Sequence, residues 1–78
     1  MLANLESNIR YWESPIRYYQ VRFYQNKNGE WVVVHVWGGK FNQRGGEKIE
    51  EFRTLDEVWE RLDKLNKRRQ QRGYRLLH

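Results

Sequence analysis

Side chains that could do chemistry gather between Trp37 and Gly46, where an aromatic residue is followed by two cations between two glycine pairs. Tryptophan offers a large flat face and one N–H donor. Glycine lets a backbone come close to a partner because it has no Cβ. A basic loop beside an exposed aromatic side chain can stack a nucleotide and pair its phosphate, here through Lys40 and Arg44. The alternative is a hairpin loop whose lysine and arginine only keep the chain soluble.

A second group of cations lies toward the C-terminus, where an expected helix changes from acidic to basic along its length. Dipole complementarity alone favours this polarity, so it is no binding signature by itself. The cations nevertheless exceed what capping requires, which leaves phosphate contact and a solvated face as equal alternatives. The candidate nucleic-acid-binding residues are Trp37, Gly38, Gly39, Lys40, Arg44, Lys48, Lys67, Arg68 and Arg72.

The sequence offers no set of residues typical of an enzyme. Ser7 and Ser14 have no base nearby in the sequence, and the glycine-rich segment is neither a Walker nor a dinucleotide-binding motif. Two histidines and no cysteine argue against a structural zinc. We therefore expect a non-catalytic protein without a metal or a cofactor.

The composition indicates one small basic domain. The 78 residues carry a net charge of +5, which favours a nucleic acid or an acidic protein as partner. We expect a single domain over residues 1–78, of which residues 1–8 could be flexible. The sequence contains neither a secretory leader, which would be basic and then apolar, nor an apolar run long enough to span a membrane. We therefore expect a cytoplasmic protein without a membrane partner.

Hydrophobic patterning predicts several short strands ahead of the helix. Tyr19, Val21 and Phe23 alternate with polar residues and would share one face of a strand. Asn28–Gly29 predicts a tight turn after it, because both residues tolerate left-handed backbone conformations. The expected strands are Ile9–Glu13, Ile16–Gln25, Trp31–Trp37 and Lys48–Phe52.

The expected strand Trp31–Trp37 is apolar on both faces, so something should cover each face. The helix would cover one face. The N-terminal segment, a second subunit or a ligand would cover the other. This two-faced strand supports an alternative function, a module that self-associates as a homodimer or binds an acidic protein. We expect His35, on the same strand, to be a structural residue.

The helix is expected to begin at Thr54, where Thr54 and Glu57 have the spacing of a capping box. Apolar residues then recur at intervals of three and four residues and form one stripe. Gly73 is expected to end the helix in a left-handed conformation. The residues after it, Tyr74–Leu77, could return as an edge strand or a docking tail.

The order of these elements resembles the WGR domain, a module of poly(ADP-ribose) polymerases and of many small bacterial proteins. The resemblance covers roughly Ile9 to Tyr74. It rests on Arg17–Val21, Asn28–Trp31, Trp37–Gly38, Gly45–Gly46, Phe52–Glu57 and Lys67–Tyr74.

The resemblance implies an α+β fold, a twisted antiparallel sheet of about four strands with one C-terminal helix packed across it. It also implies a bacterial protein that binds nucleic acid, DNA rather than RNA, with Trp37 packing on a sugar or base. The arginine of the family motif is absent, because Gly39 stands in its place. Lys40 or Arg44 could supply its charge from the loop that follows.

Overall fold

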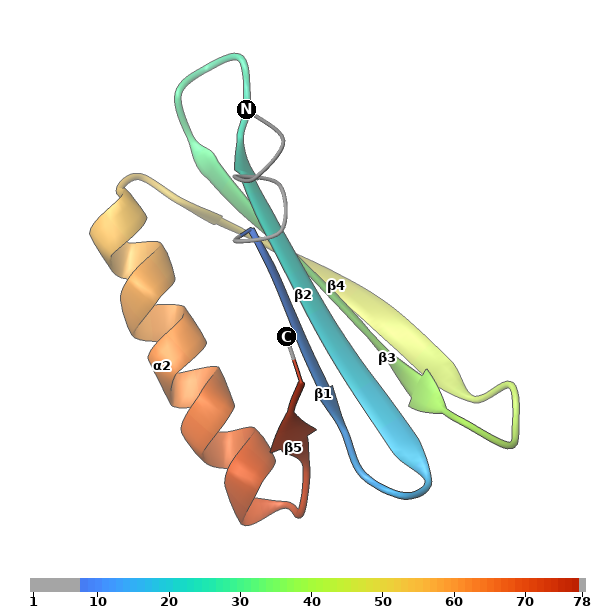
Figure 1. Ribbon diagram of the computed structural model, residues 1–78. Helices are drawn as coiled ribbons and strands as arrows, with labels where there is room; N and C mark the ends of the chain where they lie inside the picture. The colour runs from blue at the N-terminus through green and yellow to red at the C-terminus, as the bar shows by residue number, and fades with distance from the viewer. Residues whose placement is uncertain (1–7, 78) are drawn as a thin grey trace.

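The computed structural model describes residues 8–77, so the expected flexibility of residues 1–8 falls almost entirely outside the described residues. These residues form one antiparallel sheet and one long helix (Figure 1). The sheet has five strands in the order β4-β3-β2-β1-β5. The elements are β1 (Ile9–Glu13), β2 (Arg17–Gln25), β3 (Trp31–Gly39), β4 (Gly45–Phe52), α2 (Leu55–Gln71) and β5 (Arg75–Leu76).

The antiparallel pairing decides which loops can act together. The β1–β2 and β3–β4 loops lie at one end of the sheet, and the β2–β3 turn lies at the other. The C-terminal end of α2 lies toward the first of these ends, as Figure 1 shows. We call this the loop end of the molecule.

Helix α2 forms where the sequence predicts it. The hydroxyl of Thr54 accepts the backbone N–H of Glu57 at 3.2 Å, and the Glu57 carboxylate accepts the N–H of Thr54 at 3.1 Å. This capping box satisfies donors that the first turn would otherwise leave free. Gly73, with φ of 86°, follows the C-cap residue Arg72 and ends the helix as expected.

The core lies between α2 and one face of the sheet. Val21 and Val33 from the sheet and Val58 from the helix are fully buried. Each such side chain contributes about 1.5–3 kcal/mol through burial. Trp12, Tyr19, Phe23, Leu62 and Leu65 complete the buried cluster. The apolar stripe of α2 therefore meets the strand face predicted from the alternation in β2.

The sheet differs from the expected sheet of about four strands in several details, among them the end of β3, which lies at Gly39 rather than at Trp37. The C-terminal residues do return as an edge strand, β5, which pairs with β1 and makes five strands. Strand β4 begins at Gly45 rather than Lys48, because the glycines pair with the end of β3. In the β2–β3 turn only Gly29 has a positive φ, so Asn28 does not take the left-handed conformation.

The two faces of β3 have different surroundings. Helix α2 covers the face that carries Val33 and His35. On the opposite face Val32 is buried, while Val34 and Val36 are half-buried. Within residues 8–77 no helix or further strand packs over that second face. In the same part of the chain, no helix is long and apolar enough to span a bilayer.

Candidate functional site

Three segments meet at the loop end of the molecule. The backbone N–H of Lys40, in the β3–β4 loop, donates to the carbonyl of Ile16 in the β1–β2 loop at 2.9 Å. Tyr74, after α2, joins them, because it lines one pocket with Asn42 and Arg44 of the β3–β4 loop and another with Ser14 and Ile16 of the β1–β2 loop. Cationic and aromatic side chains from distant parts of the sequence therefore share this end.

Trp37 lies flat against the core rather than standing fully exposed in a loop. It belongs to strand β3 and is half-buried. Its ring stacks on Tyr19, with centroids 5.9 Å apart and planes 10° from parallel. The ring also lies over Gly46, where an added Cβ would come within 2.9 Å of it. One side of the indole is thus fixed by packing, and the remainder faces a pocket.

The pocket beside Trp37 has a volume of about 350 Å³. Two of its lining residues, Trp37 and Arg17, lie opposite the glycines Gly46 and Gly39 across the sheet. Its lining residues are Arg17, Trp37, Gly38, Gly39, Asn42, Arg44, Gly45 and Tyr74.

A second pocket, of about 390 Å³, adjoins the first because both are lined by Arg17 and Tyr74. It is completed by residues of the β1–β2 loop and of the C-terminal end of α2, among them Arg69 and Arg72. We call Arg17, Arg44, Arg69 and Arg72 the arginine cluster.

Within residues 8–77, no carboxylate lies within ion-pairing distance of any member of the arginine cluster. Neither pocket has an aspartate or glutamate among its described lining residues. The four guanidinium groups therefore keep their full positive charge at one end of the molecule. Two adjoining cavities with such walls favour the binding of anions.

Arg69 is the member of the arginine cluster that packing holds in place. Its guanidinium carbon lies 4.5 Å from the centroid of the Tyr19 ring and 5.1 Å from that of Tyr74. Such cation–π contacts contribute about 0.5–2 kcal/mol. Its Nε is buried and has no hydrogen-bond partner among the described residues. Arg69 thus joins Tyr74 to the aromatic stack under Trp37.

Loop structure fixes Arg44 near Trp37. The N–H of Gly39 donates to the carbonyl of Arg44 at 3.0 Å. The N–H of Arg44 donates to the side-chain oxygen of Asn42 at 2.9 Å. Because both bonds lie within the β3–β4 loop, the loop holds one shape, with Arg44 on the wall of the Trp37 pocket.

The structure brings together only part of the set of residues proposed from the sequence. Trp37, Gly38, Gly39 and Arg44 line the first pocket, and Arg72 lines the second. The other four cations lie elsewhere. Lys40 forms an ion pair with Glu13 (3.0 Å), Lys48 one with Glu50 (3.6 Å) and Lys67 one with Asp63 (3.2 Å), while Arg68 is exposed and lines neither pocket.

The sequence analysis missed seven lining residues, among them Arg17, Asn42, Arg69 and Tyr74. One signal could have found Arg17. It has the same parity as Tyr19 in its strand, so it had to lie on the face of the sheet that the helix covers. No local pattern marks Arg69, because its role depends on the stacking of Tyr74 after the helix has ended.

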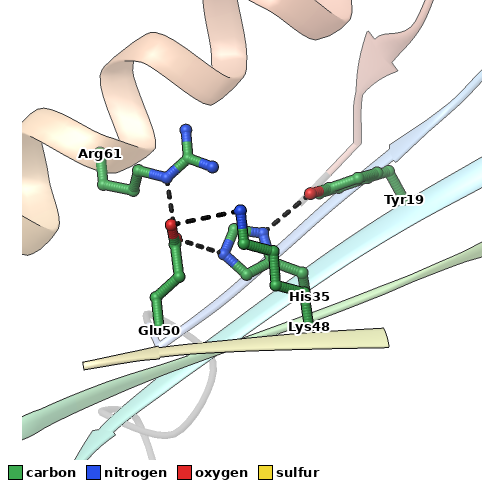
Figure 2. Close-up of polar contacts among 5 residues, drawn as sticks. All are labelled: Tyr19, His35, Lys48, Glu50 and Arg61. Carbon is green, nitrogen blue, oxygen red and sulfur yellow. Dashed lines mark hydrogen bonds and ion pairs between the residues drawn. The ribbon is translucent and has the colours of Figure 1, made fainter. Parts of the chain in front are cut away.

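A buried polar network supports Tyr19, on which Trp37 stacks (Figure 2). His35 is fully buried. Its Nε2–H donates to the Glu50 carboxylate at 2.7 Å, and its Nδ1 accepts the hydroxyl proton of Tyr19 at 2.8 Å. This assignment corresponds to a neutral imidazole, the form that burial favours by lowering the pKa of His35. Arg61 of α2 donates its Nε–H to the same Glu50 oxygen at 2.8 Å, which ties the helix to β4.

The surroundings of this network shift its pKa values. Burial lowers the pKa of His35, although the hydrogen bond to Glu50 and its charge act in the opposite direction. Burial acts to raise the pKa of Glu50, but hydrogen bonds from Arg61 and His35 outweigh it and hold that pKa below its usual value. The network therefore contains an ionised carboxylate beside a neutral histidine. This confirms the structural role expected for His35.

No group of three metal-ligating side chains occurs among residues 8–77. The chemistry that the loop end offers is the binding of an anion by arginine forks beside an aromatic ring. In a comparison with known protein families, the sequence model of the WGR domain matches residues 7–77. Comparisons with curated proteins and with solved structures give no significant match.

Proposed function

Because the chain belongs to the WGR domain family, whose members are nucleic-acid-binding modules, we propose that it binds DNA without catalysing a reaction. The contacts are to phosphate and sugar, so the module has little base specificity. The site is the pair of pockets at the loop end. A small soluble cytoplasmic protein, of bacterial type, fits this proposal.

One observation supports the proposal most strongly, the unpaired state of the arginine cluster. Lys40, Lys48 and Lys67 are partly neutralised by nearby carboxylates. The four arginines have no such partners among the described residues, and they line pockets rather than a convex surface. Arginine suits phosphate because its planar fork can donate two parallel hydrogen bonds. Charge left unpaired by the fold remains available to a polyanion.

The roles of the individual residues follow from their positions. Trp37 presents the uncovered side of its ring to a sugar or base, as the resemblance implies. Arg44 replaces the missing motif arginine, because it lines the same pocket as Gly39 and Trp37. Lys40 is the weaker candidate, since it forms an ion pair with Glu13 and lines a separate cavity. Arg17 and Tyr74 connect the Trp37 pocket to Arg72.

A salt-series titration of a labelled DNA duplex tests the function. The logarithm of the affinity should fall linearly with the logarithm of salt concentration, by about 0.9 per neutralised phosphate. In Arg17→Gln/Arg44→Gln the slope should become shallower by about two such contacts, and the affinity at low salt should fall. Blunt DNA, overhang DNA and RNA of equal length measure the preference among nucleic acids.

Lys27→Gln provides the matched control. Lys27 is exposed in the β2–β3 turn, at the end of the sheet opposite the arginine cluster. Lys27→Gln removes one positive charge, as each of the arginine substitutions does, but at the far end of the sheet. Its DNA titration should therefore stay close to that of the wild type. If Lys27→Gln weakens binding as much as Arg44→Gln, only net charge matters and the proposed site is wrong. If the wild type does not bind at low salt, the proposed function is wrong.

A second function, self-association or binding of an acidic protein, is favoured by the open face of the sheet. Val34 and Val36 are half-buried there, and Ile49 is 62% exposed. Sedimentation over a wide concentration range tests self-association. A dimer that Ile49→Glu dissociates would support it, and a strict monomer would exclude it.

A further inference from the structure

Two exposed apolar side chains lie on the two loops that carry or adjoin Arg44 and Arg17 of the arginine cluster. Phe41, at the tip of the β3–β4 loop, is 81% exposed, the highest value of any large apolar residue in residues 8–77. Ile16, in the β1–β2 loop, is 59% exposed. The hydrogen bond from Lys40 to the Ile16 carbonyl holds the two loops together. Single exposed apolar residues are common, but two on adjoining loops at a charged site indicate a contact surface.

The loop that carries Phe41 is braced. Two hydrogen bonds close it, from the N–H of Gly39 to the Arg44 carbonyl and from the N–H of Arg44 to the Asn42 side chain. The Asn42 side chain also fills the space next to Gly39. Because the loop backbone is already ordered, a ligand that contacts Phe41 has to immobilise only its side chain and not the loop.

The position of Phe41 indicates what it would meet. The next residue along the chain, Asn42, and then Arg44 line the pocket beside Trp37. A phosphate held by Arg44 would therefore place its own nucleotide, or the adjacent one, next to the Phe41 ring. In the interior of a duplex both faces of each base are covered by neighbouring bases, so a protruding ring finds a free face only at a duplex end or on an unpaired base, and only an unpaired base can bend toward the ring.

On the basis of the proposed function, we propose that Phe41 stacks on an unpaired base. The ligand of the site is then a nucleic acid in which a single strand adjoins a duplex. A basic surface with apolar tips also suits an anionic membrane. The arginines, however, line two concave pockets with Trp37 and Tyr74 in their walls. Separate cavities of this kind match single phosphates better than a flat lipid surface.

Fluorescence anisotropy at one low salt concentration tests the proposal with two duplexes of equal paired length, one blunt and one with a short overhang. The wild type should bind the overhang duplex more tightly. Phe41→Ala should lower that affinity by about 5- to 100-fold, the usual value of one base-stacking contact. Its affinity for the blunt duplex should fall much less, and its salt slope should stay unchanged, since no phosphate contact is removed.

A 2-aminopurine at the first unpaired position provides a direct signal of stacking. The wild type should quench its fluorescence, and Phe41→Ala should not. Phe41→Tyr, which keeps an aromatic ring, should restore the quenching. Ile49→Ala is the matched control, because Ile49 is also highly exposed but points to the open face of the sheet, on which the arginine cluster does not lie.

Equal binding of both duplexes by the wild type, or equal losses for both in Phe41→Ala, would overturn the stacking proposal while leaving the DNA-binding function intact. Absence of binding to either duplex would instead contradict the function itself. Binding to vesicles containing anionic lipid that needs Phe41, without an overhang preference, would overturn the proposal in favour of a membrane surface.

Discussion

At the scale of single residues, the proposed site depends on a histidine that lines neither of its pockets. His35 fixes the hydroxyl of Tyr19, and the Tyr19 ring supports both Trp37 and the guanidinium of Arg69. A buried polar group with both partners in place is stabilising, whereas loss of one partner costs about 1–3 kcal/mol. The binding surface is therefore only as well ordered as the buried polar network beneath it.

The pH dependence of stability should reveal this histidine. Burial holds the pKa of His35 below its ordinary value of 6.5. Below pH 6.5 the His35 imidazole therefore binds a proton in the unfolded chain but stays neutral in the folded chain. The free energy of unfolding consequently falls as the pH falls. The slope between pH 6.5 and 5 should approach at most about 1.4 kcal/mol per pH unit. Urea unfolding at several pH values measures it.

Glu50 acts in a separate pH range. Its pKa in the folded chain is below the ordinary value of 4.5. Its contribution to the free energy of unfolding is therefore complete above pH 4.5 and is lost at lower pH. His35→Gln should be less stable than wild type at pH 7 and should lose the slope between pH 6.5 and 5. His78, the other histidine, lies outside the described residues, and His78→Gln is the control that should keep the slope. A slope that survives in His35→Gln would refute the assignment.

At the scale of elements, the end of α2 connects stability to the site. Gly73 has φ of 86°, and an added Cβ there would meet no atom within 4 Å. Gly73→Ala should therefore cost stability through backbone conformation alone, roughly 1–2 kcal/mol. Because Gly73 lies between Arg72 and Tyr74, both of which line the pockets, DNA affinity should fall as well. Urea unfolding and duplex titration measure the two effects.

Asparagine is the matched control at this position, since it adopts the left-handed conformation more readily than alanine. Gly73→Asn should lose less stability than Gly73→Ala and keep more of the affinity. Equal losses in the two variants would mean that the left-handed conformation is not what the position requires.

Elements of this fold could be predicted from the sequence because their signals are local. The capping box at Thr54, the alternation in β2 and the glycine after α2 each act within a few residues, and each occurs as expected. The Trp37 pocket could be predicted only in part, because its geometry depends on strand register. Glu13 pairs with Lys40, for instance, only because the β1–β2 loop adjoins the β3–β4 loop. A list of nearby cations contains no information about such partners.

At the scale of the whole molecule, the fold concentrates unpaired positive charge at one end. The arginine cluster comes from β2, the β3–β4 loop and the end of α2, so it exists only when all three are assembled. The unfolded chain has the same net charge of +5 but spreads it along its length. A ligand that recognises the cluster must therefore bind the folded state in preference to the unfolded state.

Thermal unfolding with and without DNA tests this coupling. A duplex at 100 times its dissociation constant should stabilise the protein by about 2.7 kcal/mol. For a domain of this size that corresponds to a rise in the midpoint of roughly 10–20 °C. Arg17→Gln/Arg44→Gln at the same duplex concentration should show a much smaller rise, and Lys27→Gln a rise like that of wild type. A polyanion that is attracted only by net positive charge also binds the unfolded chain. If adding duplex leaves the midpoint of thermal unfolding constant or lowers it, the folded loop end therefore creates no binding site of its own.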